Sequence, residues 1–401
     1  MHIQDLMKQL HRENNSRIVL AVADGLGGLA RDGDGSTELE TAHTPYLDRL
    51  AKEGTCGLIT PVLPGITCGS GPGHLALFGY DPLKYRIGRG VLSALGIDFD
   101  LRAGDIAARG NFCTLGDDGK VTDRRAGRIS HDEGVRLTEK LRRIQLRDVQ
   151  LFIEPVMQHR FALILRGKDL GERVSDTDPQ VTGLEPLEPR GEDVRSRRTA
   201  KAVQQFLAQA RDILSGEHPA NMVILRGFSL RPEVPSFGDL YGLKACAVAS
   251  YPMYRGLSRL LGMDVERRGA DLSEQIDILA SAWERCDFFF LHYKDTDSHG
   301  EDGDFDGKVR AIEAFDEAIG RVVALAPDVL IVTGDHSSPS RLRGHSWHPV
   351  PAVLTATTCR VDQTASFGET ECAGGGLGHI EGKYLMALAL AHAGRLNKFG
   401  A

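Results

Sequence analysis

The stretch from Cys286 to Asp335 decides the fold, and it reads CDFFFLHYKDTDSHGEDGDFDGKVRAIEAFDEAIGRVVALAPDVLIVTGD. The apolar run at 286–294 predicts a buried strand, and the run at 328–335 predicts a second one. Between them we expect a helix near 307–326. Strands that alternate with helices indicate a parallel or mostly parallel sheet with helices on both faces.

The same pattern extends outward in both directions along the chain. Further strands are predicted at NMVILRG (221–227), KACAVAS (244–250) and PAVLTA (351–356). RIVLAVAD (17–24) is also an apolar run, and we place it in the same sheet because one strand with one helix cannot form a core. Thr44 and Pro45 predict the start of a helix in TPYLDRLAKEG.

Residues from about 85 to 210 have a different character. They are rich in arginine, 151–167 suggests a hairpin, and a long amphipathic helix is predicted near 194–214. We therefore expect a core formed by 1–80 and 220–401, with a smaller α+β domain inserted at 85–215. The chain should cross between the two domains near 75–95 and 205–240, where glycine and proline are frequent.

Composition excludes several classes of protein. The 48 basic and 55 acidic residues give a net charge of -7, so no basic footprint points to nucleic acid. No stretch approaches the roughly 18 apolar residues of a membrane span, and the first residues are too polar for a signal peptide. The 7 cysteines include no CxxC pair, so we expect no disulfide framework and a cytoplasmic location. The oligomeric state stays open.

Acids and histidines gather where three of the predicted strands end. They are Asp24; Asp295, Asp297, His299, Glu301 and Asp302; and Asp335, His336, His345 and His348. Ligands of open α/β sheets bind beyond the carboxyl ends of strands, so these groups should converge. Carboxylates brought together repel one another unless a cation compensates them, and the number of candidates predicts two metal ions about 3.5–4 Å apart. The ordinary alternative is a set of helix N-caps and solvated histidines.

Ser70 lies between two glycines in CGSGPGHLALFGYDP, just before a predicted helix. A helix N-terminus binds phosphate, and a serine there can ligate a metal and attack phosphorus. The ordinary alternative is a plain N-cap. His74, one turn later, either contacts phosphate or simply packs.

Seven segments together resemble the cofactor-independent phosphoglycerate mutases, specifically their shorter, archaeal-type branch in the alkaline phosphatase superfamily. The segments are ADGLGG, TPYLDRLAKEG, PGITCGSGPGHLALFGYDP, GRG…ALG, SDTDP, VTGDHSSP and HSWHPVP. The resemblance covers roughly residues 17–390. It implies an α/β fold with an alkaline-phosphatase-like, mostly parallel sheet, and an inserted domain that closes over the substrate.

The resemblance also implies roles for individual residues. Asp24, Ser70, Asp335 and His336 would bind one metal, with Ser70 as the nucleophile, and His345 would bind the second. An Asp-x-x-x-His pair completes the second site in the family. Here the family register gives Asp297 and Glu301, which we prefer, whereas the same spacing also gives Asp295 and His299. Gly71 stands where family members often carry an aspartate.

The implied reaction interconverts 3-phosphoglycerate and 2-phosphoglycerate through a phosphoserine, without 2,3-bisphosphoglycerate. The implied cofactors are two divalent ions, Mn²⁺ in the first place, with Mg²⁺, Co²⁺ or Zn²⁺ as alternatives; a carboxylate in place of an imidazole favours harder ions such as Mn²⁺ or Mg²⁺. The implied partner is a small phosphorylated substrate, with neither nucleic acid nor membrane. A metal-dependent phosphohydrolase or another phosphosugar mutase of the same superfamily is the alternative. Candidate substrate-binding residues are Arg109, Arg128, His159, Arg160, Arg226, Lys244 and His74.

Overall fold

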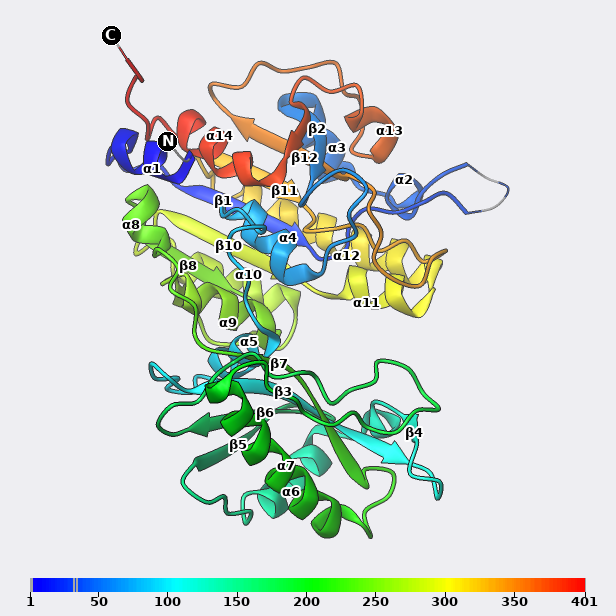
Figure 1. Cartoon of the computed structure of the whole chain (residues 1–401). Coiled ribbons are helices and arrows are strands. Elements are labelled where there is room, and N and C mark those ends of the chain that lie inside the picture. Colours follow the sequence, from blue (N-terminus) through cyan, green and yellow to red (C-terminus); the bar gives the residue numbers. More distant parts are fainter. Residues whose placement is uncertain (1–2, 32, 34, 401) are drawn as a thin grey trace. The chain divides into compact units, whose positions relative to one another are not determined.

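A computed structural model describes residues 3–31, 33 and 35–400 (Figure 1). The chain divides into two compact units. The core unit comprises Met1–Arg86, Val234–Tyr251 and Leu261–Ala401, and the inserted unit comprises Ile87–Glu233 and Pro252–Leu260. The chain therefore leaves the core unit twice.

The core unit contains an eight-stranded sheet in the order β13-β2-β12-β11-β1-β10-β8-β9. Its strands are β1 (Ile18–Ala23), β2 (Thr55–Thr60), β8 (Ala245–Val248), β9 (Asp264–Val265), β10 (Phe288–Tyr293), β11 (Val329–Thr333), β12 (Val350–Ala356) and β13 (Gly378–Glu381). Strand β1 is parallel to both neighbours, β10 and β11, whereas β12 is antiparallel to both of its neighbours. The predicted mostly parallel sheet is confirmed.

Helices cover both faces of this sheet. They are α1 (Ile3–Leu10), α2 (Glu38–Thr41), α3 (Pro45–Glu53), α4 (Ser70–Leu77), α8 (Phe237–Tyr241), α10 (Leu272–Ser281), α11 (Asp295–Asp302), α12 (Phe305–Val323), α13 (Glu369–Cys372), the 3₁₀ turn η2 (Gly382–Tyr384) and α14 (Leu385–His392). Successive side chains of β10 point to opposite faces of the sheet. Phe289 packs in one core cluster with Phe315 of α12, whereas the Phe290 ring lies 4.8 Å from the Phe78 ring at the end of α4. The strand is consequently apolar along its length, as a strand buried on both faces must be.

The inserted unit contains an antiparallel sheet of five strands. They are β3 (Ile106–Leu115), β4 (Val121–Asp123), β5 (Gln150–Met157), β6 (Arg160–Arg166) and β7 (Met222–Ser229). Its helices are α5 (Arg89–Gly96), the 3₁₀ turn η1 (Ala126–Arg128), α6 (His131–Leu141), α7 (Val194–Leu214) and α9 (Pro252–Leu260). The predicted hairpin is β5–β6, and the predicted long helix is α7.

One strand expected in the core sheet lies elsewhere. Residues 222–229 form β7, which pairs with β3 in the inserted unit, so this unit extends past the expected boundary at 215 and also takes in α9. An apolar strand satisfies its backbone in any sheet, and its sequence does not say which sheet accepts it.

The sequence predicted no disulfide framework, but one pair of cysteines is joined. Cys246 of β8 and Cys286, just before β10, form a disulfide, while the other five cysteines are free. Among the helices of the described residues, none combines the length and the hydropathy that crossing a bilayer requires.

Candidate active site

The carboxyl ends of three adjacent strands bring the predicted acids and histidines together. Asp24 follows β1, Lys294 follows β10, and Asp335 comes two residues after β11. The register pairs Ala23 with Tyr293, so the residues that follow these two strands emerge side by side. The convergence expected from sequence is therefore present in the structure.

Asp24, Asp335 and His336 form the first group that could hold a metal ion. The His336 Nε2 atom lies 3.3 Å from Asp24 Oδ1 and 3.3 Å from Asp335 Oδ2, and all three side chains are fully buried. The Ser70 Oγ atom lies 3.1 Å from the same His336 nitrogen. One imidazole thus links the proposed nucleophile to both carboxylates.

Ser70 is the first residue of α4, and Gly69 precedes it in an extended conformation. The helix can approach β11 closely because residue 73 is glycine: a Cβ atom there would overlap the backbone oxygen of Asp335. His74 is fully buried, and its Nδ1 atom lies 2.8 Å from the Ser70 carbonyl oxygen and 3.0 Å from Asp335 Oδ2. Of the two roles expected for His74, the structure favours internal packing against Asp335.

Asp297, His336 and His345 form a second group that could hold a metal ion. The His345 Nε2 atom lies 3.5 Å from Asp297 Oδ1 and 3.7 Å from Glu301 Oε1. The rings of His336 and His345 stack with centroids 3.7 Å apart, so the two groups adjoin. The His345 Nδ1 atom lies 2.9 Å from the Cys68 carbonyl oxygen, which orients the ring.

The other acid pair, Asp295 and His299, lies outside this cluster. The His299 Nδ1 atom is 3.0 Å from Asp304 Oδ2, and Asp304 caps α12. Asp295 is exposed and hydrogen-bonds with Tyr293. Because the segment is the helix α11, a shift of two positions turns a side chain by roughly 200°. The geometry therefore supports Asp297 and Glu301.

Three residues outside the expected ligand set complete the cluster. The Lys294 ammonium contacts the carboxylates of Asp24, at 3.1 Å, and Asp297. The His292 Nε2 atom lies 3.1 Å from Asp24 Oδ2. Ser338 donates to Asp297 and lies 3.2 Å from His336 Nδ1. His292 is one of the histidines that gather in this part of the sequence, and Lys294 directly precedes the acids, so both have a sequence signal; Ser338 lies within VTGDHSSP with no separate signal.

The electrostatics of the cluster suit a cation. Burial raises the pKa of Asp24, but Lys294, His292 and His336 together hold it well below the ordinary value. Burial alone would lower the pKa of His336, but Asp335, Asp24 and Asp297 raise it to about 9. The buried carboxylates thus attract positive charge strongly, and the Asp/His donor set matches Mn²⁺, Zn²⁺ or Mg²⁺.

The backbone directly after Asp24 requires a glycine. Gly25 has φ +63, and a Cβ atom there would lie 2.7 Å from Ser338 Oγ and 2.8 Å from Asp297 Oδ1. The amide of Gly25 also donates to Asp335 Oδ1 at 3.0 Å. ADG at the end of β1 is therefore required by the tight approach of three segments.

Within the inserted unit, four predicted substrate-binding residues lie near one another. The pKa of His159 falls to about 3 through burial and through Arg160, Arg125, Arg109 and Arg128. The His159 ring is 2% exposed, and neither of its nitrogens has a hydrogen-bond partner. Buried polar groups are usually satisfied, so this ring beside several arginines is an unusual feature.

The other two candidate substrate-binding residues, Arg226 and Lys244, differ from this group in their surroundings. Arg226 of β7 lies opposite Arg109 of β3, but its guanidinium also lies 3.5 Å from Asp176 and 3.6 Å from Asp178. Lys244 is exposed and precedes β8, which is parallel to β10. It therefore lies at the amino edge of the sheet, opposite the metal-ligand cluster, and the structure does not bring it to the site.

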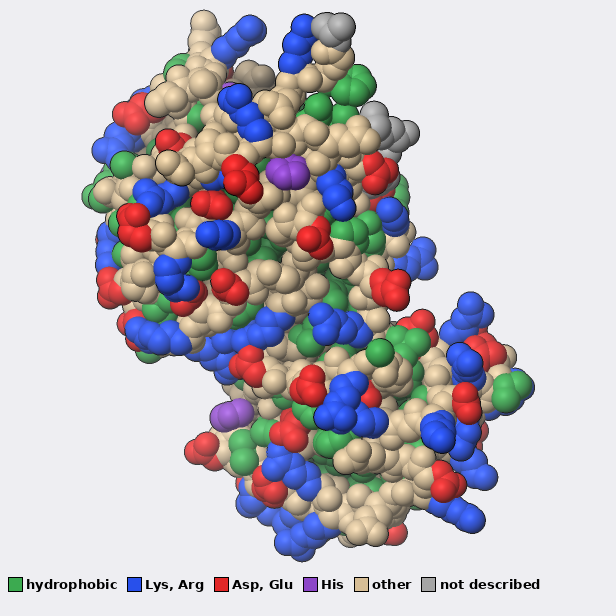
Figure 2. Space-filling view, turned by 90° about the vertical axis from the view of Figure 1, so that its left-hand side faces the viewer, with side chains coloured by type: hydrophobic (Ala, Val, Ile, Leu, Met, Phe, Trp, Pro, Cys, Tyr) green, Lys and Arg blue, Asp and Glu red, His purple; other side chains and the backbone are tan. Residues whose placement is uncertain are grey.

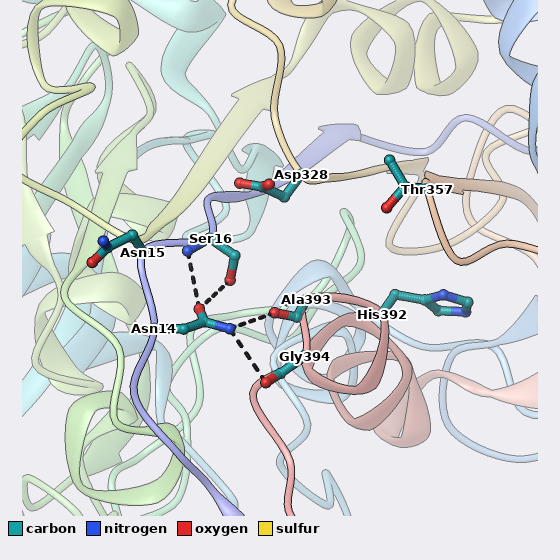
Figure 3. Close-up of a pocket in the computed structure, with 8 residues that line it drawn as sticks. All are labelled: Asn14, Asn15, Ser16, Asp328, Thr357, His392, Ala393 and Gly394. Atoms are coloured by element: carbon teal, nitrogen blue, oxygen red, sulfur yellow. Dashed lines mark hydrogen bonds between the residues drawn. The ribbon is translucent and has the colours of Figure 1, made fainter.

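A pocket at that amino edge is separate from the cluster (Figure 3). Its lining consists of Asn14, Asn15, Ser16, Asp328, Thr357, His392, Ala393 and Gly394. The Asn14 amide donates to the carbonyls of Ala393, at 2.8 Å, and Gly394, at 3.2 Å, while its oxygen accepts from Ser16. The polar groups here connect the two ends of the chain.

Figure 2 shows basic and acidic side chains mixed over the face that it presents. This distribution agrees with the near balance of 48 basic and 55 acidic residues in the sequence.

Known proteins resemble this chain along its whole length. A sequence model of the family described as 2,3-bisphosphoglycerate-independent phosphoglycerate mutase matches residues 51–221. A relative from Thermus thermophilus, named as a probable enzyme of that kind, is 49% identical, with 100% of both chains covered. A relative of the same name from Aquifex aeolicus is 48% identical, covering 99% of this chain and 100% of its own.

A solved structure gives the same result. The cofactor-independent phosphoglycerate mutase from Thermoplasma acidophilum is 31% identical, with a TM-score of 0.69, covering 94% of this chain and 100% of its own. Identity of nearly one half over the entire length, together with the shared fold, shows the relationship. The chain belongs to the family of 2,3-bisphosphoglycerate-independent phosphoglycerate mutases, and it is an enzyme.

Proposed function

We propose that this chain interconverts 3-phosphoglycerate and 2-phosphoglycerate through a phosphoserine at Ser70, without 2,3-bisphosphoglycerate. One observation carries the proposal beyond family membership. Ser70 opens a helix beside two buried carboxylates and an imidazole, with its hydroxyl 3.1 Å from His336. This is the arrangement that a metal-assisted oxygen nucleophile requires.

Two divalent ions, Mn²⁺ in the first place, fit the donors present. Asp24, Ser70, Asp335 and His336 would hold one ion, and Asp297, Glu301 and His345 the other. When bound, the ions would lower the pKa of the serine hydroxyl and neutralise charge on the phosphoryl oxygens. The carboxylate of Glu301, rather than an imidazole, favours Mn²⁺ or Mg²⁺ over softer ions.

Ser70 has the central role in the proposed chemistry. Its hydroxyl gives up its proton as the oxygen attacks phosphorus, and the bond from phosphorus to the substrate O3 breaks, with O3 leaving as a protonated hydroxyl. O2 of the same glycerate then gives up its proton and attacks the phosphoserine, the bond from phosphorus to Ser70 Oγ breaks, and the serine hydroxyl is restored. The amides at the start of α4 face the transferred group and stabilise its charge. Lys294, which contacts both Asp24 and Asp297, supplies a further cation beside the reacting group.

The inserted unit is proposed to bind the rest of the substrate and to exclude water. Arg109, Arg128, Arg160 and the unsatisfied ring of His159 offer donors for a carboxylate or phosphate. Arg226 is a weaker candidate, because Asp176 and Asp178 already engage its guanidinium. Water must stay away from the phosphoserine, since hydrolysis would turn the mutase into a phosphatase.

An enolase-coupled assay on the purified protein supplied with Mn²⁺ tests the proposal. We expect 2-phosphoglycerate to form from 3-phosphoglycerate in the absence of 2,3-bisphosphoglycerate, with no matching release of inorganic phosphate. Release of phosphate without 2-phosphoglycerate would instead assign the chain to the metal-dependent phosphohydrolases. Turnover of other phosphosugars but not of phosphoglycerate would assign it to a different mutase.

A further inference from the structure

A buried lysine contacts the loops that carry the metal-ligand cluster, and it takes no part in the proposed chemistry. Lys308 belongs to α12 and is 0% exposed. Its ammonium donates to the carbonyl oxygens of Gly25, Gly27 and Ser338, each at 2.9 Å. An ammonium has three donors and no acceptor, so these three bonds satisfy it completely.

The three carbonyls belong to the two loops that present the metal ligands. Gly25 and Gly27 follow Asp24 at the end of β1, and Ser338 follows Asp335 and His336 at the end of β11. The Ser338 amide in turn donates to Gly27 at 3.0 Å. One ammonium therefore holds both loops at fixed positions relative to α12.

Two carboxylates, the buried Glu38 and the half-buried Glu369, accept hydrogen bonds from N–H groups of the same loops. Glu38 accepts from the amide of Ser340 at 2.7 Å and from the amide of Leu29 at 3.2 Å. Glu369 accepts from the amide of Gly28 at 2.8 Å. The Lys308 ammonium thus binds carbonyl groups of the two loops, whereas the carboxylates of Glu38 and Glu369 bind their N–H groups. The opposite charges of the lysine and the two glutamates also attract each other.

Burial of a lysine is costly, because the ammonium loses its hydration. Burial lowers the pKa of Lys308, and Glu38, Glu369 and Asp297 oppose that shift. The three converging carbonyl oxygens coordinate the Lys308 ammonium in the way that backbone carbonyls coordinate a monovalent cation.

We propose that Lys308 is a positioning residue whose ammonium, acting as a built-in monovalent cation, fixes the two loops that present Asp24, Asp335 and His336 to the metals. The inference rests on the metal-dependent function proposed above. It adds a residue that touches neither substrate nor metal and acts only through the loop backbones.

The test compares Lys308→Met with Arg310→Met, which removes an exposed cation from the same helix. Hydrogen exchange of the metal-free proteins reports on residues 24–28 and 335–340, and titration with Mn²⁺ measures the dissociation constant. In Lys308→Met we expect faster exchange in these two segments. We also expect Mn²⁺ to bind about 10–100-fold more weakly, the usual cost of losing a group that orients metal ligands. Arg310→Met should behave like the wild type.

A rescue experiment separates the cation from the rest of the side chain. In Lys308→Ala, ammonium or methylammonium chloride should restore slow exchange and tight Mn²⁺ binding, whereas tetramethylammonium chloride, which is too large for the three oxygens, should not. Unchanged exchange in 24–28 and 335–340 in the Lys308→Met protein would overturn the inference. So would a variant that unfolds entirely and is not rescued, because the lysine would then support the whole fold.

These outcomes are distinguishable from failure of the proposed function. A wild-type protein that converts no 3-phosphoglycerate removes the mutase proposal, but the exchange comparison still decides whether Lys308 holds the loops. A wild-type mutase whose Lys308→Met variant keeps normal exchange and Mn²⁺ affinity removes only the role of Lys308.

Discussion

The register of four residues on α11 carries the sharpest test at the level of single side chains. Asp297 and Glu301 approach His345, whereas His299 pairs with Asp304. We expect Asp297→Ala and Glu301→Ala to abolish nearly all activity and the second metal, because each removes a proposed metal ligand. His299→Ala should cost the least, and Asp295→Ala should be intermediate, within the roughly 10–100-fold typical of groups that only support ligands.

Steady-state rates and metal content per chain, measured on the four purified variants, decide the matter. An inactive His299→Ala protein beside an active Glu301→Ala protein would reverse the assignment and give the site to the Asp295 and His299 pair.

Ser70 is the second test at this scale. Ser70→Ala removes only the hydroxyl that lies 3.1 Å from His336, so the fold should persist while mutase activity disappears. Mass spectrometry of wild-type protein quenched during turnover should place the phosphoryl group on Ser70. Ser70→Ala protein with wild-type turnover, or phosphate on another residue, would rule out this nucleophile.

At the scale of helices and strands, the approach of α4 to β11 gives a further prediction. A side chain at Gly73 would meet the Asp335 backbone, which cannot yield as a flexible side chain would. Gly73→Val should therefore destabilise the protein by about 1–3 kcal/mol, the usual cost of overpacking, and should lower activity by displacing Ser70 from His336.

Thermal unfolding and the coupled assay measure both effects. Gly216→Ala is the control, because a Cβ atom there meets nothing within 4 Å. If Gly73→Val keeps wild-type stability and rate, the close packing of α4 does not position the nucleophile.

Most strands and helix starts could be predicted from the sequence, because each depends on a local pattern of residues. The strand ends at Asp24 and Asp335 are clear from apolar runs that stop at an acid. Local patterns do not reveal which sheet a strand joins, which is why β7 was wrongly placed. Local patterns also do not reveal contacts between distant residues. Lys308 donates to the carbonyl of Gly25, 283 positions away, and no sequence motif near either residue predicts this hydrogen bond.

For the whole molecule, removal of metal is the first prediction. Chelation should abolish activity, and Mn²⁺ should restore it, with metal analysis approaching two ions per chain. Because bound ions stabilise only the folded state, the metal-loaded protein should also unfold at a higher temperature. Full activity of exhaustively chelated protein, with no metal detected, would contradict the metal assignment.

The second prediction at this scale concerns the joints between the units. The chain passes from one unit to the other after Arg86 and after Glu233, inside the ranges expected from sequence, and again after Tyr251 and Leu260. If the inserted unit closes over the substrate, 3-phosphoglycerate should slow hydrogen exchange at these joints. Exchange that is identical with and without substrate would speak against closure.

The division of the chain also determines when the enzyme can first become active. Asp24 and Ser70 precede the inserted unit, whereas Asp297, Asp335, His336 and His345 follow residue 233. A ribosome therefore completes nearly all of the inserted unit before it makes the remaining ligands, and domains tend to fold in the order of synthesis. A growing chain carries the proposed nucleophile Ser70 for most of its synthesis but lacks most of the proposed metal ligands. Truncated chains that end before Asp297 are therefore expected to be inactive both as mutases and as phosphatases.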